Sequence, residues 1–318
     1  MPQLTTVTAS VGATLNWQYT DGSSRLKALY EKAKRSQWDA ASDVDWTLDV
    51  PFGQPLAAST ESLLSFHRSP LADRGRRAND DFRWQLQSWM VGQFLHGEQA
   101  ALVVAGRLAE TVPDVDAKLC AASQAVDEAR HVEVFSRYAR EKLPDLYPVS
   151  PPLAELMRDV LADSRWDITT LGMQILVEAL AMAAFRLANW TFHDDLIKRI
   201  TSLVASDEVR HVSFGVLSLS DLYRELTTAE LADREDLVLE AAFLTRRRFL
   251  LAEVWERLDV PTATGTAFAM TEPTMIRYRQ MLFAKIVGVL RNIGLLTERV
   301  RGGLAELDLL LPREDARC

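Results

Sequence analysis

The sequence predicts an all-α protein built around a bundle of four long helices. The 318 residues include only 14 Gly and 12 Pro, whereas the helix-forming residues Ala, Leu, Arg and Glu are abundant. From about Asp80 onward, long stretches with helical apolar periodicity follow one another with few breaking residues. Several long helices joined by a few short connections and one longer crossover are typical of such a bundle.

The N-terminal segment, positions 1–78, is the least regular part of the chain. A short helix is predicted from Ser23 to Lys34, and the breakers Pro51, Gly53 and Pro55 follow it. Because no long periodic stretch lies in this region, we expect residues 1–78 to wrap around the bundle within one single domain of residues 1–318.

The remaining helices are predicted from apolar periodicity and from the breaks between the periodic stretches. Asp114 follows Pro113 and is expected to cap the second long helix. Four prolines between Pro144 and Pro152 predict a non-helical crossover. Residues 79–224 should then form the core, and residues 225–318 the C-terminal helices and a polar tail. The predicted helices are 79–110, 115–142, 153–163, 167–192, 195–224, 229–258 and 272–297, with a weak break at 193–195 and a Gly/Thr-containing loop at 261–273.

Charge and composition exclude several classes of protein. The net charge of −8 disfavours nucleic acid as a partner. No run of about 18 uninterrupted apolar residues occurs, and the N-terminus lacks the basic and apolar regions of a secretory signal, so we expect no membrane-spanning helix. Two cysteines, Cys120 and Cys318, cannot build a disulfide framework. We therefore expect a cytoplasmic protein with no membrane or nucleic-acid partner.

Two nearly identical hexapeptides carry the candidate chemistry. They are Asp-Glu-Ala-Arg-His-Val at 127–132 and Asp-Glu-Val-Arg-His-Val at 207–212. Within each, the Glu and the His are separated by one helical turn, which places both side chains on the same face of a helix. A single Glu-x-x-His pair arises easily by chance, but two copies in matching contexts predict a metal site on Glu128, His131, Glu208 and His211.

Two further glutamates extend this pattern into an internal repeat. Glu98 precedes Glu128 by the same distance in sequence as Glu178 precedes Glu208, so the whole ligand set occurs twice at a constant step along the chain. Both added glutamates lie in apolar surroundings, where an unpaired charge is costly and a metal ion would compensate it. His96 is close to Glu98 in sequence, and we expect it to lie off the metal-facing side or to contact a ligand from behind.

The midpoints of the two Glu pairs predict how the helices come together. Residue 113, in the Pro113 turn, is halfway between Glu98 and Glu128, and residue 193 is halfway between Glu178 and Glu208. Each arm therefore spans about 22 Å of helix. Two antiparallel hairpins would bring four glutamates and two histidines to one height, which predicts a dinuclear site in the pattern of the ferritin-like di-metal bundles.

With these motifs the sequence resembles the carboxylate-bridged di-iron oxidases and oxygenases. This superfamily includes the ribonucleotide reductase small subunit, the ligand-binding oxidases, bacterial hydrocarbon hydroxylases and p-aminobenzoate N-oxygenase. The resemblance covers roughly residues 36 to 220, including residues 38–46, which are loosely similar to an N-terminal segment of the ligand-binding oxidases. It implies that Asp127 and Asp207 accept the free ring N–H of the two histidines, with Arg130 and Arg210 pairing to them.

The chain departs from each specialised member of this superfamily. Phe135 stands where the reductase small subunit carries its radical tyrosine, and Met173 stands where the ligand-binding oxidases carry a tyrosine. Met182 replaces a hydroxylase threonine, and Val204 replaces an additional N-oxygenase histidine. The motifs therefore specify the kind of site without specifying the reaction.

The donor set of four carboxylates and two imidazoles suits Fe or Mn. We expect two Fe ions or a mixed Mn/Fe pair, O2 as co-substrate, and oxidase or oxygenase activity on an apolar, aromatic or amine small molecule. An electron-donor protein and a homodimer are the expected partners. The alternatives are a radical-generating reductase subunit, an iron-oxidising storage protein and a bundle that binds metal only structurally.

Overall fold

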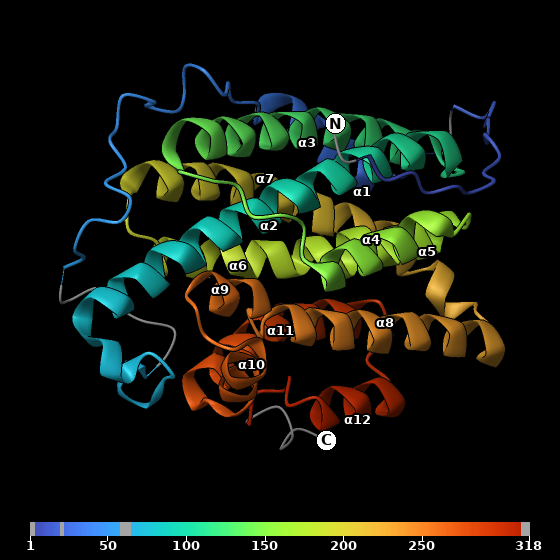
Figure 1. The fold of residues 1–318 in the computed structure, drawn as a ribbon. Coiled ribbons are helices and arrows are strands. Elements are labelled where there is room, and N and C mark those ends of the chain that lie inside the picture. Colours follow the sequence, from blue (N-terminus) through green and yellow to red (C-terminus); the bar gives the residue numbers. More distant parts are fainter. Residues whose placement is uncertain (1–3, 20–21, 58–64, 313–318) are drawn as a thin grey trace.

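The computed structural model describes residues 4–19, 22–57 and 65–312, which contain helices and no strand (Figure 1). The predicted polar tail and Cys318 lie outside the described residues. Two long helical hairpins form the centre of the molecule. The first joins α2 (Gly75–Thr111) to α3 (Val115–Lys142). The second joins the helical stretch 166–191 to α7 (Asp195–Leu219), so the predicted all-α bundle is confirmed.

The two hairpin turns are built in the same way. Asp114 accepts a hydrogen bond from the backbone N–H of Ala117 at 2.9 Å, as its predicted role as an N-cap requires. Asp194 caps α7 by accepting from the N–H of Ile197 at 2.9 Å. Each aspartate satisfies a backbone donor that the first helical turn leaves free. The turns therefore lie at the positions that the spacing of the glutamates predicts.

The described part of the N-terminal segment runs along the first hairpin. The Thr14 N–H donates to the carbonyl of Glu110 at 3.0 Å, and the Asn16 side chain donates to the carbonyl of Pro113 at 3.1 Å. Helix α1 (Ser24–Arg35) then packs against α3 and α7. This segment leads directly to the residues that close one side of the candidate site.

A crossover connects the two hairpins. It is held by the side-chain amide of Gln93, which donates to the carbonyl of Pro148 and accepts from the N–H of Ser150, each at 2.9 Å. Helix α4 (Pro151–Ala162) follows and begins with two prolines, which fit the first helical turn because no N–H is needed there. The predicted crossover is therefore present, and the helix after it begins at Pro151, slightly before the predicted start at residue 153.

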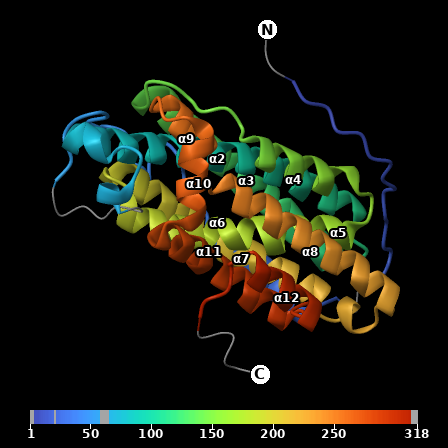
Figure 2. The same cartoon turned by 60° about the horizontal axis from the view of Figure 1, so that its bottom comes forward.

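The C-terminal helices form a second layer against the central hairpins (Figures 1 and 2). Helix α8 packs against α4 and begins with a capping box between Thr227 and Glu230. Helix α11 packs against α6 (Glu178–Thr191), and α12 packs against α8. The helices of this layer are α8 (Thr228–Arg248), α9 (Ala252–Arg257), α10 (Thr262–Thr271), α11 (Pro273–Asn292) and α12 (Glu298–Glu306).

Three predictions for the C-terminal region are wrong. The single helix 229–258 is interrupted at 249–251, where Leu251 takes a left-handed conformation with φ of 61° while its side chain is buried. The loop 261–273 is largely helical, since α10 packs on α9, and a Cβ on Gly265 would lie 2.2 Å from the Trp255 ring. The helix 272–297 ends at Asn292 before Gly294, whose φ is 78°, and α12 follows.

The second hairpin begins with the most apolar helix of the chain. By length and composition the stretch Trp166–Thr191 could span a membrane, but 83% of its apolar window is buried inside the protein. This burial is what a core helix of the bundle requires. It consists of α5 (Trp166–Thr170), a π-helical segment Leu171–Val177 and α6 (Glu178–Thr191).

The π-helical segment sets the position of Glu178, which directly follows it. Two glycines let neighbouring helices approach this widened turn. A Cβ on Gly172 would lie 2.4 Å from Val160 of α4, and a Cβ on Gly215 of α7 would lie 2.8 Å from Gln174. Such π-helical turns are rare in proteins, and they are found frequently at functional sites. The sequence pattern gave no sign of this widened turn.

We predict that Gly172→Ala destabilises the protein by about 1–3 kcal/mol, because the added methyl group collides with Val160 in a filled core. The matched control is Gly106→Ala on α2, where no atom lies near the added Cβ. That change should stabilise the helix by about 0.5–1 kcal/mol. Urea unfolding of both variants measures the difference, and equal stabilities would contradict the close approach.

We also predict that His193, in the turn between α6 and α7, makes the protein less stable in acid. Burial, helped by the charge of Arg83, lowers the pKa of His193 to about 4, below the usual value near 6.5. As pH falls below 6.5, the unfolded chain binds a proton that the folded chain does not, so stability falls. Between about pH 6.5 and 4.5 the free energy of unfolding of His193→Gln should decline by about 2 kcal/mol less than that of the wild type. The exposed His67→Gln is the control.

Candidate metal centre

All six residues that the sequence predicts as metal ligands meet at one level of the bundle. Each of these residues is at most 5% exposed. Donor atoms of Glu98, Glu128, His131 and Glu208 lie within 4.8 Å of one another, and so do those of Glu128, Glu178 and His211. The ligand atoms come from α2 (Glu98), α3 (Glu128 and His131), α6 (Glu178) and α7 (Glu208 and His211).

Glu128 and Glu208 lie between the two histidines. Glu128 places one oxygen 3.1 Å from Nδ1 of His131 and the other 3.0 Å from Nδ1 of His211. Glu208 likewise places one oxygen 3.5 Å from Nδ1 of His131 and its other oxygen 3.5 Å from Nδ1 of His211. Each of these carboxylates can therefore contact two ions at once.

The other two glutamates each face one histidine. An oxygen of Glu98 lies 3.3 Å from Nδ1 of His131, and an oxygen of Glu178 lies 3.8 Å from Nδ1 of His211. The cluster thus divides into two similar halves, each with one histidine and one glutamate of its own and with two shared carboxylates. This division fits two adjacent cations and follows the internal repeat of the sequence.

Several donor atoms of the cluster have no hydrogen-bond partner and are therefore free to bind a metal ion. Both carboxylate oxygens of Glu208, one oxygen of Glu178 and Nδ1 of His211 are buried without a hydrogen-bond partner among the described residues. Buried polar atoms are normally paired, and a buried carboxylate without a partner is costly. Four carboxylates with two imidazoles are also the donor chemistry that Fe and Mn accept. The residues therefore fit a dinuclear metal site.

The protonation of these groups follows from their crowding. Burial raises the pKa of Glu98, Glu178 and Glu208, and repulsion among the carboxylates adds to this effect. Burial alone would also raise the pKa of Glu128, but the two histidines beside it outweigh burial and lower it. Without metal, the cluster therefore retains protons on several carboxylates, and cations must displace them.

The two aspartates of the motifs orient the histidines in a crossed arrangement. Asp207 lies 3.2 Å from Nε2 of His131, and Asp127 lies 3.2 Å from Nε2 of His211. Each motif therefore supplies the aspartate for the histidine of the other motif. A carboxylate at Nε2 fixes the ring so that Nδ1 faces the metal side, and it raises the basicity of the imidazole.

Two arginines join the aspartates into one buried network. Arg130 contacts Asp127 at 2.6 Å and Asp207 at 2.9 Å. Arg210 contacts both aspartates at 2.7 Å. Burial would raise the pKa of Asp127, but His211 and Arg210 outweigh it and keep this pKa low. The aspartates therefore remain ionised, as their contacts with the histidines require.

The N-terminal segment contributes two residues to this network that were assigned no role from the sequence. The indole N–H of Trp38 donates to Asp207 at 2.7 Å, and its ring lies against the guanidinium of Arg130 at 4.6 Å. The Gln37 amide donates to Asp127 at 3.0 Å and accepts from Arg130 at 2.6 Å. Trp38 belongs to the stretch that resembles the ligand-binding oxidases, which was the one available signal.

Gln124 is a further residue of the site that was not predicted. Its amide donates to Glu178 at 2.7 Å and to Glu128 at 3.1 Å. It precedes Glu128 by about one helical turn on α3, so the helical spacing alone could have indicated it. The amide links a shared carboxylate of the first hairpin with the glutamate at the start of α6.

A small cavity of about 30 Å3 opens beside three of the glutamates: Glu98, Glu178 and Glu208. Phe94, Val177 and Leu180 are apolar residues near the ligands in sequence, and they line this cavity. Met182 instead lines a groove of about 630 Å3 between α1, α6, α7 and α11, which none of the six predicted ligands lines. The space of about 30 Å3 beside the cluster therefore lies on the side of the glutamates, and a smaller one of about 10 Å3 adjoins His211 and Asp127.

Several residues near the site in sequence are engaged elsewhere. His96 lies 2.9 Å from the carbonyl of Tyr147, off the metal-facing side as expected. Phe135 is buried between Phe94 and Phe185. The hydroxyl of Tyr138 donates to Asp194 at 2.8 Å, which ties this tyrosine to the turn of the second hairpin.

Comparison with known proteins gives the fold class. No family model matches the chain, and no curated protein matches it. An R2-like ligand-binding oxidase from Sulfolobus acidocaldarius is 17% identical with a TM-score of 0.51, over 86% of this chain and 92% of that chain. Another R2-like ligand-binding oxidase, solved with an aerobically reconstituted Mn/Fe cofactor, is 17% identical with a TM-score of 0.45, over 90% of both chains. The chain thus has the ferritin-like bundle fold that its motifs predict.

We predict that Asp207→Asn and Asp127→Asn each weaken metal binding by about 10- to 100-fold, because each removes the carboxylate that orients one histidine. Mn(II) titration with calorimetric detection measures the affinity. The control is Glu133→Gln, an exposed residue of α3 beside the first motif. Wild-type affinity in both aspartate variants would show that the crossed contacts do not support the histidines.

Proposed function

We propose that the protein is an O2-activating oxidase or oxygenase that uses two Fe ions or a mixed Mn/Fe pair. The observation that carries this proposal is the buried cluster of two histidines with four glutamates, two of which lie between both histidines. His131 and Glu98 would hold one ion, and His211 and Glu178 the other. Glu128 and Glu208 would contact both.

The metal pair would supply electrons for the reduction of O2, and the reduction of O2 would in turn drive the oxidation of the substrate. The contribution of the chain is to hold this pair and to control access to it. Asp127 and Asp207 hold the ring N–H of each histidine and so keep Nδ1 free for a metal. Gln124 holds one oxygen of Glu178 and one of Glu128 in place. The burial of all six ligands excludes bulk water from the site.

A reductase-like radical generator with a Mn/Fe pair is the second candidate. It is supported by Phe135, which is buried in the position where related reductase subunits carry a tyrosine. Tyr138 is an unsuitable substitute, because burial and the neighbouring Asp194 raise its pKa and its hydroxyl is bound to that carboxylate. An electron spin resonance signal after loading with Mn, Fe and O2, together with activity in a partner-dependent reductase assay, would favour this candidate.

We predict that Glu128→Ala and Glu208→Ala abolish the binding of two irons per chain, because each removes a carboxylate that both ions share. After anaerobic addition of Fe(II), the wild type should consume O2 rapidly on mixing, and both variants should not. Glu133→Gln again serves as the control. Binding of two irons by either alanine variant would count against the site. If the wild type binds iron but does not consume O2, the metal site is structural only.

Two measurements distinguish the remaining alternatives. Anomalous scattering at the Fe and Mn edges identifies the ion in each half of the site. Light scattering determines the mass, for which we expect a homodimer and not a large storage cage. The need for an electron-donor protein remains a prediction that turnover assays with and without reductant will test.

A further inference from the structure

The groove of about 630 Å3 between α1, α6, α7 and α11 has an aliphatic floor. Met182 of α6 and Val212 of α7 form part of this floor and are only 1% and 5% exposed. Val209 and Val216 lie on the same face of α7 as Val212, one helical turn to either side of it. A groove of this volume is in the size range of sites that hold small organic molecules, and its floor suits an apolar chain.

Four basic side chains surround this floor. Arg25 and Lys32 come from α1, Arg186 from α6 and Lys285 from α11. No acidic residue lines the groove in the part of the chain that the structure describes, and none of the four forms an ion pair with a described residue. The protein as a whole has a net charge of −8. The groove therefore concentrates positive charge on a chain that is acidic overall.

Basic residues outside the groove show a different arrangement. At the end of α1, Lys34 and Arg35 both contact Glu31. Between α4 and α5, Arg165 contacts Asp163 at 2.7 Å and a second aspartate, at position 233, at 2.6 Å. The basic residues of α1 thus divide into those that are paired with an acid and those that line the groove without one.

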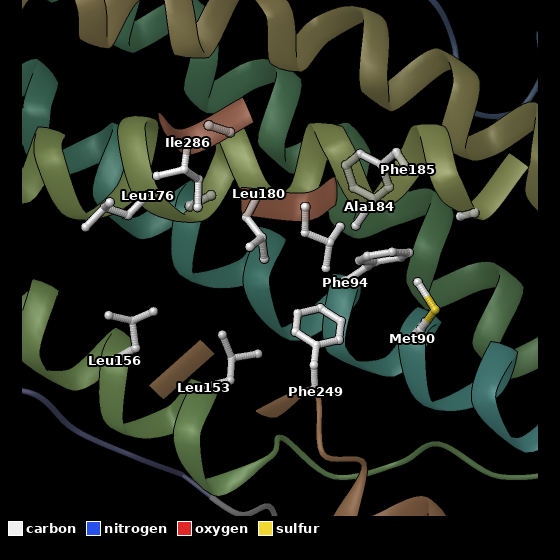
Figure 3. Close-up of a cluster of buried hydrophobic side chains, with 14 of the residues drawn as sticks. Met90, Phe94, Leu153, Leu156, Leu176, Leu180, Ala184, Phe185, Phe249 and Ile286 are labelled. Carbon is white, nitrogen blue, oxygen red and sulfur yellow. The ribbon is translucent and has the colours of Figure 1, made fainter. Parts of the chain in front are cut away.

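Lys285 and Arg186 lie close enough for their charges to repel each other. Lys285 is half-buried, and burial together with the charge of Arg186 lowers the pKa of its ammonium group. The next residue, Ile286, is buried in the same apolar cluster as Leu180, which fixes this part of α11 beside α6 (Figure 3). The fold therefore holds two like charges near each other, and an anion placed between them would relieve the repulsion.

We propose that this groove binds an amphiphile whose aliphatic chain lies on the valines of α7 and whose phosphate head group is held by Arg186 and Lys285. The inference does not depend on the proposed function. A phosphate monoester carries a charge of about −1.5 to −2 at neutral pH, so it can neutralise two cations where a carboxylate neutralises one. Its oxygens accept charge-assisted hydrogen bonds from a guanidinium and an ammonium group together.

The shape and lining of the groove narrow the ligand further. No aromatic side chain lines it among the described residues, which favours an aliphatic chain over an aromatic ring. Met182 and Val212 are almost inaccessible, so a chain can contact them only by entering the groove between α1 and α11. A lipid that stays in a bilayer keeps its chains among the other lipids. The ligand is therefore a free single-chain molecule and not a membrane surface.

The test uses octyl phosphate as the probe, below its micellar concentration, with calorimetric detection on the purified protein. One molecule per chain should bind. Octyl glucoside has the same chain without a charge, and inorganic phosphate has the charge without a chain. Each should bind about tenfold more weakly or worse, because each lacks one half of the interaction. Octanoate, with a single charge, should also bind more weakly than octyl phosphate.

Two variants locate the head group. Arg186→Gln and Lys285→Gln should each weaken binding of octyl phosphate about tenfold, because each removes a charged donor. Binding of octyl glucoside should not change. The matched control is Arg277→Gln, an exposed residue of α11 that does not line the groove. It removes the same charge from the same helix and should leave the affinity for octyl phosphate unchanged.

The comparison of ligands on the wild type does not depend on the folding of any variant. Absence of octyl phosphate binding, or equal affinity for octyl phosphate and for octyl glucoside or octanoate, would overturn the inference. Unchanged binding by both folded glutamine variants would also overturn it, since the phosphate would then be held elsewhere, for example by bound metal ions. Co-sedimentation with vesicles of anionic phospholipid, without binding of free octyl phosphate, would show a membrane-binding surface instead.

Discussion

The burial of four carboxylates at one level of the bundle is the constraint on which the rest of this structure depends. Each loses its hydration, and together they repel one another, so they are stable only with protons or cations among them. Two histidines face them from α3 and α7, and Asp127 and Asp207 hold those histidines from behind. The surrounding layers then serve to keep this arrangement dry and in register.

The crossed contacts make the site a property of both hairpins together. Because Asp127 orients His211 and Asp207 orients His131, neither hairpin alone could complete its half of the site. Arg130 and Arg210 each contact both aspartates, so the same contacts also fasten α3 to α7. The internal repeat of the sequence thus becomes an approximate two-fold arrangement in space.

The sequence predicted what local spacing determines. Helical periodicity and the turns near residues 113 and 193 predicted both hairpins, and the equal spacing of the glutamates brought all six candidate ligands together. It could not predict features that depend on distant contacts. The helix predicted at 229–258 is interrupted without Gly or Pro at 249–251, where Leu251 is left-handed with a buried side chain, and Trp38 reaches Asp207 from a distant part of the chain.

The two sides of the site have different surroundings, although the ligands themselves follow an approximate two-fold arrangement. On the side of the histidine Nε2 atoms, Gln37 and Trp38 cover the aspartates and arginines. On the opposite side the glutamates line a cavity with apolar walls. Glu98 and Glu178, which each face a single histidine, line this cavity together with the shared carboxylate Glu208. The larger of the spaces that adjoin the cluster therefore lies on the side of Glu98 and Glu178.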